Sequence, residues 1–178
     1  MKLENLLTER KSAIFKKWLD ALLESYPQDA QRFFRKEKSR FANPVGQTMS
    51  NHLSDLYDGL LRGDEEASLA GRLDGIVRIR AVQDFKPSQA IGFILQLKEI
   101  LHEALEQEMV SDTIAADLAV LEKRIDKTVL LAFDMYEQCR HKIYQLRVDE
   151  CKRQVSGLMR RANLVCEIPG LETDPRPD

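Results

Sequence analysis

The most constraining feature of this sequence is a segment of about fifty residues near its C-terminal end that contains no proline and, until Gly157, no glycine. Its apolar residues recur in steps of three and four, which indicates one face of an α-helix. A continuous helix over about 112–163 would be about 75 Å long, whereas a domain of this size is only about 30–40 Å across. The helix is therefore expected either to kink or to project beyond the core.

A projecting helix needs a surface that covers its apolar stripe, and a second copy of the same helix is the simplest one. We therefore predict a homodimer built on this helix. The candidate dimer residues are Leu118, Leu121, Ile125, Val129, Tyr136, Ile143 and Leu146.

The rest of the chain also has helical periodicity, interrupted by a few prolines and glycines. We expect a helix from about residue 3 to Pro27, a short helical turn near Phe33, and a helix over 45–62 that ends at Gly63. Asp64 is a candidate cap for the next helix. A further helix is expected to start at Pro87 and to run to about residue 108.

These patterns predict an all-α fold, a globin-like or irregular helical bundle of about five to six helices with a long C-terminal helix. One helical domain is expected over residues 1–163, because a chain of 178 residues has room for one real core. Residues 164–178 contain three prolines among mostly polar residues and are expected to be a disordered tail.

Composition excludes several classes of protein. The chain is 43% hydrophobic with a net charge of −2 and three cysteines, which does not fit a disordered chain, a disulfide scaffold or a strongly basic nucleic-acid-binding domain. The N-terminus lacks the apolar region of a signal peptide. The most apolar stretch, around residues 91–97, is far shorter than the ~20 residues needed to cross a bilayer. We expect a cytoplasmic protein with no membrane partner.

No catalytic motif is found: the sequence has no glycine-rich phosphate loop, no CxxC and no HExxH. We therefore expect no enzyme activity and no cofactor. One spacing resembles that of di-iron helical bundles, Glu99 followed by His102, but no second such pair exists. A single histidine (His52, His102 or His141) serving haem is the other alternative. Solvated or half-buried side chains are the favoured interpretation.

Positive charge is concentrated in two regions. Residues 1–40 hold ten Lys and Arg against six Asp and Glu, and residues 140–161 hold seven against two. The second cluster leaves nucleic-acid binding open as an alternative. A solvated helix face explains it better, so nucleic acid is not the expected partner.

The cysteines offer little chemistry. Cys139 and Cys151 are twelve residues apart, or about 18 Å along one helix, which is too far for a disulfide within it. In a parallel homodimer each could meet its own copy. Inert packed thiols are the favoured interpretation, and the odd count, completed by Cys166, fits a reducing compartment.

Three segments carry a resemblance to a known family. They are Asn43-Pro44-Val45-Gly46, the run Ile79-Arg80-Ala81-Val82-Gln83-Asp84-Phe85-Lys86-Pro87-Ser88-Gln89-Ala90, and Phe133-Asp134-Met135-Tyr136 with Cys139-Arg140, which the basic stretch Leu146-Arg147-Val148 follows. Together they resemble the N-terminal domain of the RsbRD type, in the RsbT co-antagonist family of the bacterial stressosome. The resemblance implies an all-α sensory domain, globin-like in shape but usually without haem, which dimerises and leads through a long helix into a STAS domain.

The sequence contains no STAS domain, so what the resemblance implies is the input half of such a protein. We predict a non-catalytic regulatory or sensory domain, homodimeric, that binds a partner protein or a small signal. Two interpretations of the most specific segment stay open. Arg80 and Asp84 hold a corner between helices together, or Arg80, Gln83, Asp84 and Gln89 line a ligand or partner site.

Overall fold

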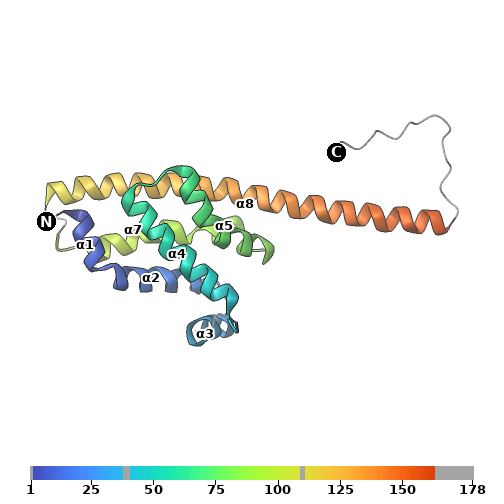
Figure 1. Cartoon of the computed structure of the whole chain (residues 1–178), viewed down its shortest axis with the longest axis horizontal. Helices are drawn as coiled ribbons and strands as arrows, with labels where there is room; N and C mark the ends of the chain where they lie inside the picture. Colours follow the sequence, from blue (N-terminus) through green and yellow to red (C-terminus); the bar gives the residue numbers. More distant parts are fainter. Residues whose placement is uncertain (1, 38–40, 109–110, 163–178) are drawn as a thin grey trace. The chain divides into compact units, whose positions relative to one another are not determined.

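The computed structural model describes residues 2–37, 41–108 and 111–162. The chain divides into two compact units, Met1–Arg140 and His141–Asp178. In the described residues every regular element is an α-helix, which confirms the all-α prediction (Figure 1). The expected disordered tail, residues 164–178, lies outside the described residues.

Eight helices are present in the described part of the chain, more than the five to six expected. They are α1 (Leu3–Glu9), α2 (Lys11–Glu24), α3 (Gln28–Lys36), α4 (Pro44–Arg62), α5 (Glu66–Val82), α6 (Pro87–Ile91), α7 (Phe93–Ala104) and α8 (Asp112–Arg161). The long C-terminal helix is confirmed.

Two unforeseen breaks account for most of the difference in number. The first expected helix is interrupted at Arg10, whose guanidinium donates to the carbonyl of Ala104 at the end of α7 and pairs with Glu108. The helix expected from Pro87 is interrupted at Gly92, where a Cβ atom would lie 2.5 Å from the carbonyl oxygen of Ser88.

The boundaries of α4 follow from local chemistry. The side chain of Asn43 accepts a hydrogen bond from the Gly46 amide at 2.8 Å, and Pro44 occupies the first turn. Gly63 ends the helix in the left-handed conformation, with φ 73°. The capping role expected of Asp64 is wrong, because its carboxylate instead pairs with Arg72 at 2.5 Å and α5 begins without a side-chain cap.

The core of the first unit is centred on Trp18, which is fully buried. Its indole nitrogen donates to the carbonyl of Phe93 at 2.7 Å, and its ring lies 6.4 Å from that of Tyr57. These contacts join α2 to α7 and α4, while α4 packs extensively along α5 (Figure 1).

Helix α8 contributes a buried stripe to the first unit. The buried positions are Ile114, Leu118, Leu121, Ile125, Thr128, Ala132 and Tyr136. None of the described residues beyond Tyr136 is buried. No helix in the described ranges has the combined length and hydrophobicity that crossing a membrane requires.

Candidate functional site

The corner between α5 and α6 has an unusual backbone. The amide of Phe85 donates to the carbonyl of Arg80 at 3.3 Å, and the amide of Asp84 donates to that of Ala81 at 3.4 Å. This is the Schellman arrangement, which places the residue after the cap in the left-handed region, usually as glycine. Here that residue is Asp84, with φ 62°. It is the one non-glycine residue with a positive φ in the described part of the chain.

Arg80 lies at the centre of this corner and is fully buried. Its guanidinium donates to the Leu22 carbonyl at 3.3 Å, to the Ser25 hydroxyl at 2.6 Å and to the Gln89 carbonyl at 2.8 Å. The ring of Phe85 covers it at 4.5 Å. The cation thus ties α5 to α2 and to α6 through neutral acceptors, and burial lowers its pKa.

Tyr26 completes the enclosure of the guanidinium. Its ring centroid is 5.3 Å from the Arg80 guanidinium carbon and 5.0 Å from the ring of Phe85. Its hydroxyl donates to the side-chain oxygen of Gln83 at 2.8 Å. Burial raises the pKa of Tyr26, and the nearby Arg80 charge partly opposes that shift. The phenol therefore stays neutral at physiological pH.

Helix α8 holds the same corner from a different direction. The Tyr136 hydroxyl donates to the carbonyl of Phe85. One turn later, Arg140 donates to the Ala81 carbonyl at 3.0 Å and pairs with the Asp84 carboxylate at 2.5 Å. The carbonyls and carboxylate that the left-handed turn presents are thus bound by the last two turns of α8 within the first unit.

The four residues predicted from the sequence at this corner lie in different environments. Arg80 and Asp84 both hold the corner, as the first interpretation states, but each does so through its own partners. Asp84 binds Arg140, a partner that the sequence did not reveal, and α6 begins without a side-chain cap. Gln83, Asp84 and Gln89 are exposed, whereas Arg80 is buried and presents no surface to a ligand. A ligand contact of the three exposed residues stays a prediction.

Sequence reasoning missed Ser25, Tyr26 and Phe85 as members of this corner. Only the aromatic character of Phe85 and Tyr26 signals a role, because such rings often enclose a cation. Their proximity depends on the contacts of the Arg80 side chain with the end of α2, and residues 25 and 80 are far apart in the chain.

The histidines have ordinary partners. His102 contacts the Glu122 carboxylate at 2.7 Å, His52 the Arg72 carbonyl at 2.9 Å, and His141 the Gln145 side chain at 2.8 Å. Within residues 2–37, 41–108 and 111–162, no group of three or more His, Cys, Asp or Glu could hold a metal. Cys139 is half-buried and Cys151 exposed, and Cys166 lies outside the described residues.

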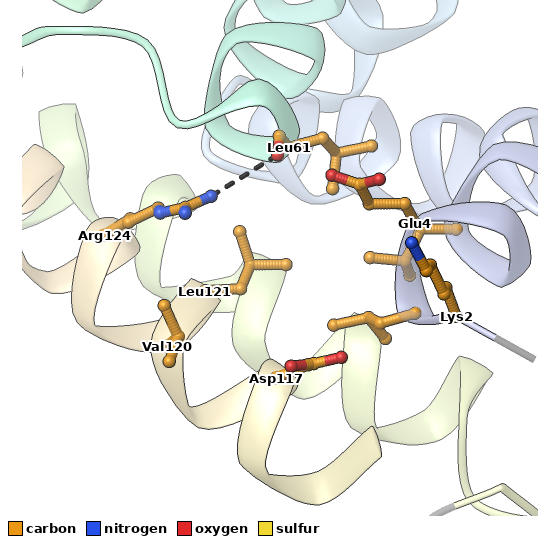
Figure 2. A pocket seen from close by; sticks show the side chains of 9 residues that line it. Lys2, Glu4, Leu61, Asp117, Val120, Leu121 and Arg124 are labelled. Atoms are coloured by element: carbon orange, nitrogen blue, oxygen red, sulfur yellow. Dashed lines mark hydrogen bonds between the residues drawn. The ribbon is translucent and has the colours of Figure 1, made fainter. Parts of the chain in front are cut away.

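A cavity of about 310 Å³ lies between α1, α4 and α8. Figure 2 shows Lys2 and Glu4 on one side of the cavity, with Leu121 and Val120 across from them and Asp117 below. Arg124 closes one end and donates to the Leu61 carbonyl at 3.4 Å. The lining of the cavity combines apolar side chains with charges of both signs. The cavity volume is at the lower end of the range for small-molecule sites.

The candidate dimer residues do not share one environment. Leu118, Leu121, Ile125 and Tyr136 are buried in the chain's own first unit, which corrects their assignment to a dimer contact. Their apolar periodicity serves the intramolecular core. Val129 and Ile143 are half-buried, and Leu146 is exposed.

Comparison with known proteins decides the family. Residues 12–150 match the family described as the RsbT co-antagonist protein rsbRD N-terminal domain. The chain belongs to this family. An uncharacterized protein of Archaeoglobus fulgidus is 26% identical to it over 134 residues, which cover 75% of this chain and 79% of the relative. No solved structure matches the chain.

The rsbRD N-terminal domain match includes the whole corner and α8 as far as residue 150. It therefore covers most of the first unit and extends into the start of the second. The family is one of regulatory, sensory domains, which is the class predicted from the sequence.

Proposed function

We propose that this rsbRD N-terminal domain is a non-catalytic regulatory domain that acts through protein contacts made by α8. The observation that carries the proposal is the direct attachment of Tyr136 and Arg140 to the strained corner at Asp84. An event that alters the packing around Arg80 changes the positions of the groups to which α8 is bonded. Because α8 continues to Arg161, the proposal places the partner contacts on this helix, where such a change would alter them.

The homodimer predicted from the sequence is retained as part of this proposal, at a different place on α8. Leu130 and Phe133 are 67% and 48% exposed and lie one turn apart. Exposed Lys127 precedes them, and exposed Asp134 and Glu137 follow. In an antiparallel pair of helices related by a twofold axis, the cation of one copy meets the anions of the other around an apolar centre.

Sedimentation of the full chain tests the dimer. We expect twice the chain mass of 20.5 kDa for the wild type and a monomer for Leu130→Asp. Val155→Asp is the matched control, since it places the same charge on an exposed apolar position of α8 in the second unit. A wild-type monomer, or an equal effect of the two substitutions, would contradict the dimer.

Recovery of partners from the native cell tests the regulatory role. A kinase module retained by the wild-type chain and lost with Arg140→Met is the expected result, because that substitution removes the bonds of Arg140 to Ala81 and Asp84 and leaves Tyr136 to hold α8 to the corner. Arg78→Met is the control, as Arg78 is an exposed cation paired within α5. Recovery of an unrelated enzyme complex, unaffected by Arg140→Met, would contradict the proposal and indicate an accessory role.

A small-molecule signal is the other input that the sequence predicts. The cavity between α1, α4 and α8 is the candidate, and its mixed charge suits a small amphiphilic molecule. Val120→Trp would fill it from an exposed position. A metabolite that raises the melting temperature of the wild type, but not of Val120→Trp, would support the assignment; an equal rise in both would refute it.

A further inference from the structure

The second unit carries an apolar stripe that no described part of the chain covers. Its positions follow the alternating steps of three and four of a coiled-coil heptad: His141, Val148, Val155 and Ala162 at a, and Tyr144, Cys151 and Leu158 at d. All seven are exposed, among them Val155 at 53% and Leu158 at 63%. Valine at a with leucine at d is typical of two-stranded parallel coiled coils.

The positions that flank this stripe hold cations and neutral side chains but no anion. The e and g positions are Gln145, Arg147, Lys152, Gln154, Met159 and Arg161. The acids of this segment, Asp149 and Glu150, fall at b and c on the outer face, where Glu150 pairs with Arg153 at 2.6 Å. Flanking charges choose the partner of a coiled coil.

A second copy of this segment is a poor partner. In a parallel pair, Arg147 at g of one helix faces Lys152 at the following e of the other, and like charges repel. In an antiparallel pair, e faces e and g faces g, so cations again meet only cations or neutral side chains. A lipid surface is less suited than a helix, because the stripe has the narrow a/d width of a seam rather than a broad apolar face.

We infer that residues 141–162 form a two-stranded coiled coil with a helix of another protein that carries Asp or Glu at its e and g positions. The inference deepens the proposed function, on which it rests, by naming the chemistry of the partner. Arg147, Lys152 and Arg161 select that partner by charge, and the Val148–Leu158 seam supplies the buried contact. His141 at the first a position is a polar residue of the kind that fixes register.

Binding of a synthetic helix to the full chain tests this inference. The probe, the Glu peptide, is a fluorescent three-heptad peptide with Val at a, Leu at d and Glu at e and g. The control, the Lys peptide, is identical except that it has Lys at e and g. We expect the Glu peptide to bind about tenfold more tightly, since three ion pairs each contribute a fraction of a tenfold step. The preference should shrink as salt is raised.

Variants separate the seam from the charges. Val155→Asp should abolish binding of the Glu peptide, whereas Leu146→Asp, at an exposed f position of the same helix, should leave it unchanged. A chain with Arg147→Glu, Lys152→Glu and Arg161→Glu should prefer the Lys peptide instead. All of these positions are exposed, so folding is retained, and circular dichroism verifies the helix content.

Three results would overturn the inference: equal binding of the two peptides, a dimer that Val155→Asp dissociates, or binding to phosphatidylserine vesicles that depends on Val155 while the Glu peptide does not bind. The dimer proposal fails separately. If Leu130→Asp leaves sedimentation unchanged while the Glu peptide still binds, the dimer is refuted and the coiled-coil inference is supported. If the Glu peptide does not bind while Leu130→Asp still dissociates a dimer, the coiled-coil inference is refuted and the dimer is supported.

Discussion

Replacing the buried guanidinium by an apolar side chain of similar length, Arg80→Met, should destabilise the first unit by about 3 kcal/mol. Three hydrogen bonds to Leu22, Ser25 and Gln89 are lost, at a net value of about 1 kcal/mol each after exchange with water. Loss of the cation over the Phe85 ring costs about 1 kcal/mol more. Contacts of the methionine sulfur with the same rings return about 1 kcal/mol.

The measurement is the free energy of unfolding from urea titration, supported by the melting temperature. For a unit of this size, about 3 kcal/mol corresponds to a fall of about 10 °C. Arg80→Lys should be at least as harmful, because an ammonium group cannot span acceptors on two helices as the guanidinium does. Arg78→Met, two residues earlier, is the control. Its ion pair with Asp74 lies on the surface, where solvent screens it, so its loss should leave the free energy of unfolding almost unchanged.

An Arg80→Met variant within about 0.5 kcal/mol of the wild type would refute this reasoning. Such a result would mean that the cost of burying the cation equals everything that its contacts contribute, as happens when some buried ion pairs are replaced by apolar side chains. The Arg80 cluster would then specify the corner's conformation without stabilising it.

Further predictions concern the backbone and alkaline pH. Gly71→Ala should raise the unfolding free energy by about 0.5–1 kcal/mol, because a Cβ there meets open space inside α5. Gly63→Ala should lower it by at least about 1 kcal/mol, because alanine resists the φ of 73°; thermal melts of the two variants should move in opposite directions. Asp84→Gly should relieve about 1 kcal/mol of strain and so cost less than Asp84→Ala, which chemical denaturation can measure. Burial raises the pKa of Tyr57, so its contribution is complete below the unfolded value of about 10 and is lost as pH rises above it. Tyr57→Phe should flatten that alkaline loss, at the expense of the hydrogen bond to the Leu7 carbonyl; an unchanged slope would disprove the assignment.

The elements that the sequence predicted are those whose causes are local. Pro44, Gly63 and Pro87 mark helix boundaries because ring geometry and left-handed freedom act within one turn. The break at Arg10 was not foreseen, because its reason lies at the distant end of α7, where the side chain binds Ala104. A periodic run of leucines cannot reveal such a partner.

At the candidate site, too, the features with local causes could be predicted and the distant partners could not. Arg80 and Asp84 were identified as members of a corner, since both lie where a helix ends and another begins. Their enclosure by Tyr26 and Arg140 depends on the packing of α2 and α8, which no spacing along the chain encodes. For the apolar stripe of α8, the pattern was recognised but the surface that covers it was not. Its periodicity was correct, but periodicity alone does not distinguish an intramolecular core from an interface.

The placement of the one tryptophan gives the protein a built-in optical reporter. Trp18 is sealed from water, with its indole N–H fixed to the Phe93 carbonyl, so its fluorescence responds to the contact between α2 and α7. Arg80 binds the C-terminal end of the same helix, at Leu22 and Ser25. An input that loosens the corner can therefore be followed in real time, in the unlabelled full-length chain, as a red shift of the Trp18 fluorescence emission.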